Sequence, residues 1–440
     1  MNERTYYYSS FLASLASNLI SPFLSIYALF LGATKTLIGL LSGLQQLINI
    51  FFQPFWGRIT ESTRRKKRFI IIGKIIWAIL WIPIAFVKDP YQLIVLISIQ
   101  SIFSAAVTPA WISLLIRIIP RYKRGRARGN INIFSQTGAF IGSLIGGFLL
   151  NRYGFIPFVF YMACLFGILS RIPFIVSPEP KTPVSKRSVK KILKESYNIL
   201  QIFKYKKLLR LAIAISFLNF ACSIASPLFS VYIIEGMGGS KMDLAIISAI
   251  GSISAILFFR PWGTLVDYLG RRTVMLGCII PISLLPFVYF VAPNILLIYL
   301  YSFVVNMSWA GFNLASFAYL ADVIPKEKSP SLLSIYNLFT GFSSFIAPLV
   351  GGIIADFFGI KVVFILSTFL RLSSIPFLEK LSEKRGYVPT GIFGSAVIPF
   401  DISYRIENFL SVYSLVFQEV KKSKVITNFR RLLQKIFVPT

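Results

Sequence analysis

The sequence predicts an all-α membrane protein, with twelve transmembrane helices in two homologous six-helix bundles and both chain termini in the cytoplasm. Three observations predict this fold class. Apolar stretches long enough to cross a bilayer recur along the 440 residues, of which 55% are hydrophobic and only 14% are charged. The second half of the chain repeats motifs of the first half. Basic residues gather in alternate connecting segments.

The apolar segments define the expected helices in order. The first could be mistaken for a signal peptide, but it is too long for one and its sequence recurs in the seventh. The twelve segments lie near residues 8–32, 37–57, 69–87, 91–115, 130–150, 155–176, 209–234, 242–260, 273–292, 294–320, 331–354 and 359–378.

Two short motifs, about 200 residues apart, repeat one pattern. Each has Trp-Gly, a carboxylate four residues after the Gly, and a basic pair that begins four residues after the carboxylate. The Ser-Pro pair at Ser21 in the first segment also recurs, at Ser226 in the seventh. A repeat of this length predicts two homologous bundles, residues 1–177 and 208–380. The motif residues are Trp56, Gly57, Glu61, Arg65 and Lys66 in one copy, and Trp262, Gly263, Asp267, Arg271 and Arg272 in the other.

The formal net charge of +30 follows the same topology. If the N-terminus is cytoplasmic, 38 of the 46 basic residues fall in cytoplasmic loops, in the linker 178–207 or in the tail 381–440. We therefore expect contact with anionic lipid headgroups and no nucleic acid partner. Helical spacing of apolar and basic positions in the tail predicts an amphipathic helix on the inner leaflet. The external loops hold only Lys35, Lys88, Arg152, Lys241 and Lys361.

The duplicated motif resembles motif A of the major facilitator superfamily of secondary transporters, Gly-x-Leu-x-Asp-x-x-Gly-Arg-Arg/Lys. The resemblance covers roughly residues 5–380 and implies that family's fold and transport by alternating access. The first copy has Glu61 in place of the Asp and Arg64 in place of the second Gly. The second copy matches at Gly263, Leu265, Asp267, Gly270, Arg271 and Arg272.

The resemblance implies a gating role for the motif charges at the cytoplasmic mouth. Ion pairs there would hold while the mouth is closed and break when it opens. We expect Asp322 to join Asp267, Arg271 and Arg272 in one half, and Arg117 to pair with Glu61 in the other. The alternative, that these charges only anchor loops at the headgroups, stays open.

Polar residues within the apolar segments predict where a solute would bind. Ser10, Ser14, Asn18, Ser21 and Ser25 form one helical stripe, and Ser216, Asn219, Ser223, Ser226 and Ser230 form its counterpart. Amides that faced lipid would be costly, so they should turn inward. Hydrogen bonds between helices are the alternative use of these groups. The candidate cavity residues are Asn18, Gln45, Asn49, Gln100, Gln136, Asn219, Asn306, Asn313 and Asn337.

The ionisable groups indicate what kind of solute this is. The chain has no His, and no carboxylate lies near the centre of an apolar segment. Arg171 and Arg371 are cations within segments, and we expect both to extend to the headgroups. Gln100 stands where drug/proton antiporters of the family carry an Arg, yet Gly129, Gly138, Gly142 and Gly147 keep the antiporter glycine spacing. Packing alone would also explain these glycines.

We therefore expect a transporter of a neutral or weakly polar small solute in the plasma membrane. A multidrug-type exporter of lipophilic compounds and a transporter-like receptor are the alternatives. We expect no enzyme activity, cofactor or metal, because the chain lacks His, a Cys–His set, a buried carboxylate pair and a phosphate loop. A monomer is the expected oligomeric state.

Overall fold

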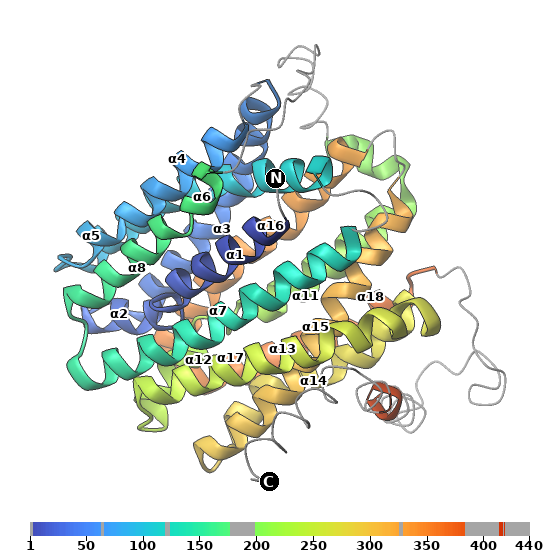
Figure 1. Cartoon of the computed structure of the whole chain (residues 1–440). Helices are drawn as coiled ribbons and strands as arrows, with labels where there is room; N and C mark the ends of the chain where they lie inside the picture. Colours follow the sequence, from blue (N-terminus) through green and yellow to red (C-terminus); the bar gives the residue numbers. More distant parts are fainter. Residues whose placement is uncertain are drawn as a thin grey trace, which may run out of the picture.

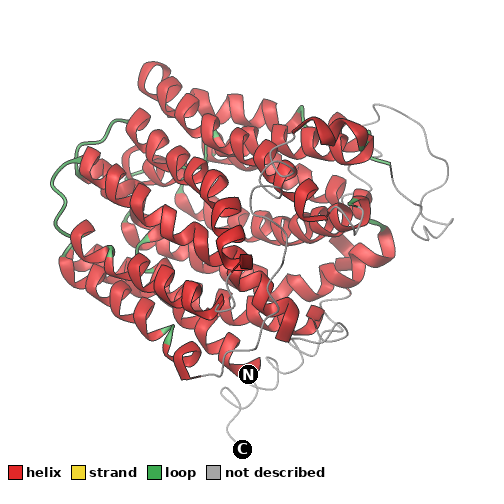
Figure 2. Cartoon of the chain, turned by 90° about the horizontal axis from the view of Figure 1, so that it is seen from above, coloured by secondary structure: helices red, strands yellow, loops and turns green. Residues whose placement is uncertain are grey.

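The computed structural model describes residues 3–62, 66–118, 124–176, 199–324, 329–382, 413–416 and 418. All regular secondary structure in these ranges is helical (Figures 1 and 2). The first half contains α1 (Glu3–Asn18), η1 (Ser21–Phe23), α2 (Leu24–Phe30), α3 (Lys35–Ser62), α4 (Lys66–Ile79), α5 (Trp81–Ile84), α6 (Pro90–Ile118), α7 (Arg124–Tyr153), α8 (Pro157–Leu169) and α9 (Ile172–Val176).

The second half follows the short helix η3 (Ile199–Lys204) and has a similar order of elements. Its helices are α11 (Lys206–Ser223), α12 (Leu228–Val231), η4 (Tyr232–Gly236), α13 (Lys241–Leu269), α14 (Arg271–Val291), α15 (Ile295–Val323), α16 (Ser329–Phe358), α17 (Ile360–Leu372) and α18 (Ile375–Glu379).

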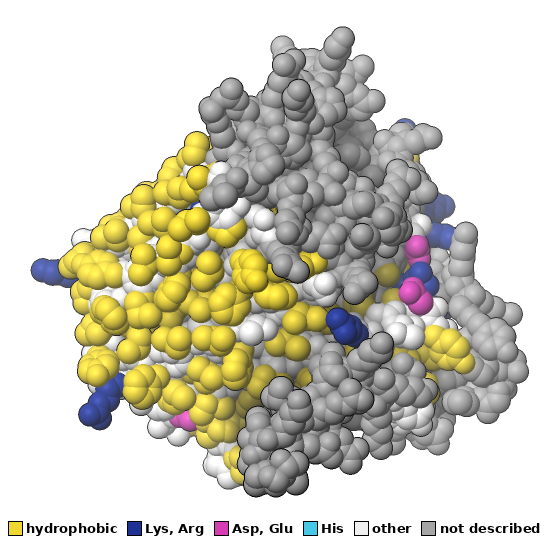
Figure 3. Space-filling view, in the orientation of Figure 1, with side chains coloured by type: hydrophobic (Ala, Val, Ile, Leu, Met, Phe, Trp, Pro, Cys, Tyr) yellow, Lys and Arg dark blue, Asp and Glu magenta, His cyan; other side chains and the backbone are white. Residues whose placement is uncertain are grey.

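The length and hydropathy of these helices make the chain an integral, multi-pass membrane protein. Ten helices within the described ranges are long and apolar enough to cross a bilayer. Two shorter apolar helices, Ile70–Ile84 and Pro157–Leu169, lie where the third and sixth segments were expected. Large hydrophobic side chains spread over the outer face drawn in Figure 3, with few charges among them, as a lipid-facing surface requires.

The repeated Ser-Pro pair interrupts one helix in each half. The first segment breaks between α1 and α2 at Pro22, and the seventh breaks between α11 and α12 at Pro227. Proline has no N–H to donate within a helix, so each break leaves backbone carbonyls without their usual partner. Duplication of the pair therefore explains why both halves begin with a broken helix.

Two helix pairs make the most extensive contacts between the halves. We call them seams: one runs between α3 and α16, the other between α7 and α13. Glycines allow close approach at both: Gly39 and Gly43 lie against backbone carbonyls of α16, and Gly147 lies against Ala245 of α13. Gly138 and Gly142 instead pack α7 onto α1 within the first half. Close packing is thus a sufficient use of three of the four antiporter-spaced glycines.

Arg371 does not extend to the headgroups, and neither does Arg171; that expectation is wrong. Arg371 is 2% exposed, and its guanidinium donates to the carbonyls of Ile282 (2.7 Å) and Cys222 (3.3 Å) and to Ser367 Oγ (3.1 Å). Arg171 is 3% exposed and donates to Ser170 Oγ at 2.8 Å.

The reason for the burial of Arg371 is a local shortage of backbone donors. The Ile282 carbonyl would normally accept from residue 286, which is a proline within α14. The Cys222 carbonyl lies in the last turn of α11, where intrahelical donors end. Arg371 supplies the missing donors at both places, so it joins α17 to α14 and to the broken helix.

The described part of the tail contacts the second half. Tyr413 and Val416 are buried in the same hydrophobic cluster as Trp262, and the Tyr413 hydroxyl shares a hydrogen bond with Ser308 Oγ. The rings of Tyr413 and Trp262 meet edge to face, with centroids 6.0 Å apart. Most of the predicted amphipathic tail, like most of the linker 178–207, lies outside the described residues.

Candidate functional site

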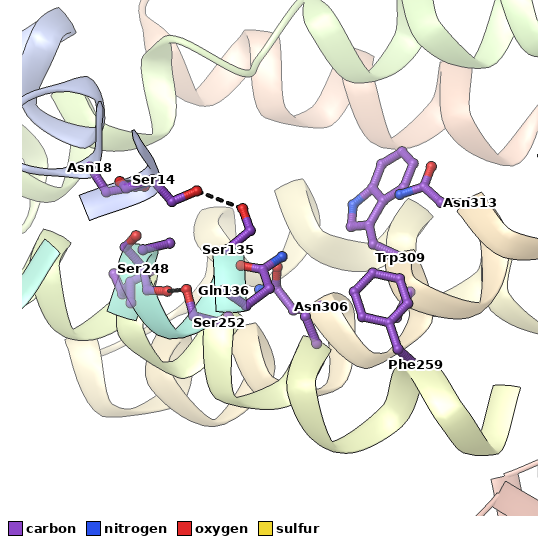
Figure 4. Close-up of a pocket in the computed structure, with 15 residues that line it drawn as sticks. Ser14, Asn18, Ser135, Gln136, Ser248, Ser252, Phe259, Asn306, Trp309 and Asn313 are labelled. Atoms are coloured by element: carbon purple, nitrogen blue, oxygen red, sulfur yellow. Dashed lines mark hydrogen bonds between the residues drawn. The ribbon is translucent and has the colours of Figure 1, made fainter. Parts of the chain in front are cut away.

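A cavity of about 510 Å³ lies between the two halves (Figure 4). Helices α1 and α7 of the first half and α13 and α15 of the second half supply its walls. Its residues are Ser14, Asn18, Ser135, Gln136, Ala139, Ile247, Ser248, Gly251, Ser252, Ala255, Phe259, Asn306, Trp309, Ala310 and Asn313.

Hydrogen bonds hold the polar groups of this cavity in place. Ser14 Oγ and Ser135 Oγ lie 2.5 Å apart and join α1 to α7. Asn18 Nδ2 donates to the Ser14 carbonyl at 2.9 Å, and Asn306 Nδ2 donates to the Ser302 carbonyl at 2.8 Å. Each asparagine uses one amide N–H in this way, so its amide oxygen and second N–H can serve a solute.

Gly251 of α13 gives Asn306 the space it occupies. A Cβ on Gly251 would lie 3.0 Å from the amide carbon, oxygen and nitrogen of Asn306. That is tighter than an ordinary van der Waals contact, which for two carbon atoms is about 3.5–4.0 Å. Because Gly251 has no side chain, the Asn306 amide of α15 can lie directly against α13.

Chemically, the cavity combines amides, hydroxyls and two aromatic rings. None of the described residues that line it carries a formal charge. Phe259 and Trp309 offer flat apolar faces, while the serines and asparagines offer donors and acceptors. This lining can hold an uncharged solute in a fixed orientation.

Four of the nine predicted cavity residues line the cavity: Asn18, Gln136, Asn306 and Asn313. The other five do not. Gln100 is 5% exposed and its amide donates to the Trp77 carbonyl of α4 at 3.0 Å, so it joins two helices of the first half. Asn49 donates to the Gln45 carbonyl one turn earlier on α3. Asn219 is half-buried on α11, and Asn337 is exposed on α16.

Ser248, Ser252, Phe259 and Trp309 line the cavity but are not among the cavity residues expected from the sequence. Ser248 and Ser252 are spaced four apart and repeat the stripe pattern on α13, so periodicity could have found them. The aromatic residues give no such signal, because the chain contains many similar residues that face lipid. The stripe on α11 supplies none of the residues that line this cavity.

The second motif copy brings its charges together at one end of the bundle. Arg271 Nε lies 3.2 Å from Asp322 Oδ2, and Arg271 Nη2 lies 3.5 Å from Asp267 Oδ1. Gly270 links α13 to α14 with a positive φ of 93°, and Gly263 lies within α13. Both aspartates are largely exposed, and all three charged residues belong to the second half. The pairs therefore brace α13, α14 and α15 against one another.

Less of the first copy can be described. Gly57 and Glu61 lie near the end of α3, and Arg117 lies near the end of α6. Arg65 and the side chains of Glu61 and Arg117 lie outside the described residues. In the second copy, Arg272 is the second residue of α14 and is half-buried.

Comparison with known proteins agrees with this architecture. The sequence profile of the Major Facilitator Superfamily matches residues 7–267 and 211–429. An uncharacterized MFS-type transporter of Bacillus subtilis (strain 168), YuxJ, is 24% identical over 82% of this chain and 93% of its own length. The multidrug resistance protein MdtG of Proteus mirabilis (strain HI4320) is 29% identical over 61% of this chain and 68% of its own.

Solved structures share the fold. A mutant of the nucleoside transporter NupG superposes with a TM-score of 0.72 at 16% identity, covering 86% of this chain and 99% of that one. A bacterial homolog of the human lysosomal transporter Spinster, in an inward-facing and occupied conformation, gives 0.65 at 13% identity, covering 86% and 95%. From the profile match, the relatives and the helical architecture, we conclude that this chain belongs to the major facilitator superfamily and is a transmembrane transporter.

Proposed function

We propose that the protein carries a neutral, weakly polar small solute across the plasma membrane by alternating access of the cavity between its halves. The observation that supports this most strongly is the uncharged lining of amides, hydroxyls and aromatic rings. An anionic solute would need a buried cation within reach, and none of the described lining residues is one.

In this proposal twelve segments cross the membrane, counting the shorter helices Ile70–Ile84 and Pro157–Leu169. The positive-inside distribution supports cytoplasmic termini, and with that orientation Asp267, Arg271 and Asp322 would lie at the cytoplasmic end. The bacterial relatives favour the plasma membrane. The amphipathic tail and the linker would face anionic headgroups, and the unit of transport would be a monomer.

Thermal unfolding in the presence of candidate solutes tests the substrate class. Purified protein is heated with sugars, nucleosides, amino acids and lipophilic cations, and a solute at 100 times its Kd should add about 2.7 kcal/mol of stability. We expect stabilisation by one neutral class. Stabilisation by the acidic amino acids only, or by the lipophilic cations only, would contradict the proposal.

Two variants locate the binding site of any solute that stabilises the protein. Asn18→Ala and Gln136→Ala remove cavity amides, and each should weaken binding by about tenfold, the cost of one lost hydrogen bond. Asn337→Ala is the matched control, because Asn337 is an exposed amide outside the cavity. Equal weakening by the control would place the binding site elsewhere.

A multidrug-type exporter is the second candidate. Phe259 and Trp309 are the observation in its favour, since aromatic faces bind lipophilic compounds and cations. The name of the relative MdtG also points to that class. Stabilisation by lipophilic cations, lost in Trp309→Ala, would favour this candidate over the first.

A further inference from the structure

At the end of the bundle opposite Asp267, a carboxylate of one half caps a helix of the other half. Asp356, in the last turns of α16, accepts hydrogen bonds from the backbone N–H of Lys35 (3.1 Å), the backbone N–H of Thr36 (2.8 Å) and Thr36 Oγ1 (2.6 Å). Lys35 and Thr36 open α3, where the first N–H groups have no intrahelical acceptor. The negative side chain also meets the positive end of the helix dipole.

At the seam between α7 and α13 the charge is reversed: a cation of one half lies at the C-terminal end of a helix of the other half. Lys241, the first residue of α13, extends its Nζ to the carbonyl of Leu150 in the last turn of α7, at 3.2 Å. The ammonium also lies 4.6 Å from the ring centroid of Phe155. A cation near carbonyls at a helix C-terminus is favourable for the same reason that an anion is favourable at an N-terminus.

Local hydrogen bonds leave Lys241 available for this contact. The N-terminus of α13 is capped within its own half by a capping box of Ser240 and Asp243. The Lys35 Nζ lies 3.9 Å from Glu235 Oε2 of the second half. This half-exposed ion pair beside Asp356 is a weaker contact. Each of the three contacts joins a residue of one half to a residue of the other.

Close packing beneath these contacts prevents partial separation. Gly39 and Gly43 of α3 lie against the carbonyls of Pro348 and Phe345, and Gly352 of α16 lies against that of Lys35. With backbones this close, α3 and α16 cannot separate at this end while Asp356 keeps its hydrogen bonds.

We propose that Asp356 and Lys241 form a two-point helix-end latch that keeps this end of the transporter closed and sets the balance between its two conformations. The latch depends on alternating access but not on the substrate class. Loss of one helix cap corresponds to about a twofold to thirtyfold change in an equilibrium constant. Asp356 therefore acts as a positioning residue that makes no contact with the cavity.

Distances between spin labels can test the latch without any solute. Tyr153→Cys on α7 and Phe358→Cys on α16 are exposed positions in different halves at this end. The pair is labelled in a full-length background in which Cys164, Cys222 and Cys278 are replaced by Ala. Double electron–electron resonance then measures the two populations in lipid nanodiscs.

We expect Asp356→Ala to raise the ratio of the long-distance population to the short one by about tenfold. Lys241→Met should raise it by about twofold to fivefold, because a cation at a helix C-terminus contributes less than a helix cap. Asp356→Asn should have a smaller effect, because an Asn oxygen can also cap a helix. Thr36→Val removes one of three accepted bonds, so it provides a mild variant should Asp356→Ala fail to fold.

Asp89→Asn is the matched control. Asp89 lies in the loop before α6, and its carboxylate accepts from the N–H of Tyr91 within the same half. It should leave the distances unchanged. Wild-type distances in both Asp356→Ala and Thr36→Val, or the same change in Asp89→Asn, would overturn the latch. A negative solute screen would not affect this result, so failure of the latch and failure of the substrate proposal are distinguishable.

Discussion

At the scale of single residues, the Asn306 amide keeps its position because Gly251 of α13 has no side chain. In Gly251→Ala, the new Cβ would lie 3.0 Å from the Asn306 amide, so the amide must move. A displaced amide loses its hydrogen bond to the solute, which is worth about 0.5–1.5 kcal/mol. We therefore expect about twofold to tenfold weaker binding of the transported solute, measured by the shift of the thermal midpoint with solute concentration.

Gly129→Ala controls for the change in helix propensity. Gly129 also lies in a helix, α7, and a Cβ there would meet nothing within 4 Å. This variant should bind the solute like the wild type. If Gly251→Ala binds equally well, Asn306 does not hold the solute.

Residue patterns predicted part of the site. Asn18, Gln136, Asn306 and Asn313 were expected in the cavity from the cost of exposing amides to lipid, and all four line it. The same argument applies to Gln100, whose amide meets the Trp77 carbonyl instead. An inward-facing amide can meet either a solute or a neighbouring helix, and sequence spacing cannot distinguish the two.

At the scale of helices, Arg371 shows how a buried cation can be held mainly by backbone carbonyls, with one hydroxyl beside them. In Arg371→Lys the charge stays buried, but a single ammonium cannot reproduce the fork that reaches Ile282 and Cys222. We expect a loss of about 2 kcal/mol of stability, the penalty for unsatisfied buried carbonyls. The thermal midpoint should fall clearly below that of the wild type.

Arg152→Lys is the control for that experiment, because Arg152 is exposed at the end of α7. It should unfold at the wild-type temperature. If Arg371→Lys also does so, the carbonyls of α11 and α14 do not need the guanidinium.

The positions of the helices were easier to predict than the contacts between them. Hydropathy placed an apolar segment at each helix that spans the described bundle, and the repeated Ser-Pro pair fell at both breaks. The role of Arg371 was not predictable in this way. It follows from Pro286 and the end of α11 meeting across three helices, which is a property of the packing and not of any local pattern.

At the scale of the whole molecule, the charges of the second motif copy differ from the latch in one respect. Arg271 pairs with Asp267 and Asp322 inside one half, so these pairs need not break when the halves move apart. Exposed pairs of this kind contribute about 0–1 kcal/mol. A gating role therefore requires Asp267 to gain a contact with the other half in the alternative conformation.

Asp267→Asn tests that requirement. We expect little change in unfolding temperature, but a shift towards the conformation seen here, because the alternative one loses a charged contact. The readout is the same pair of spin labels, attached at Tyr153→Cys and Phe358→Cys. The population with the short distance between them should grow. Unchanged populations would leave these charges only the role of bracing α13, α14 and α15 against one another.

Whether transport is coupled to protons depends on where titratable groups lie in the whole molecule. A proton-coupled carrier needs a titratable group near its binding site, and the described cavity lining has none. Asp267 and Asp322 lie at one end of the bundle and Asp356 at the other, away from that lining. Proteoliposomes loaded with the solute identified by thermal unfolding should therefore release it at the same rate, within about twofold, with or without an imposed pH difference. Valinomycin and K⁺ hold the membrane potential at zero in both cases, so only the proton gradient differs. A rate that rises steeply with the imposed pH difference would show that a proton-binding group controls transport after all.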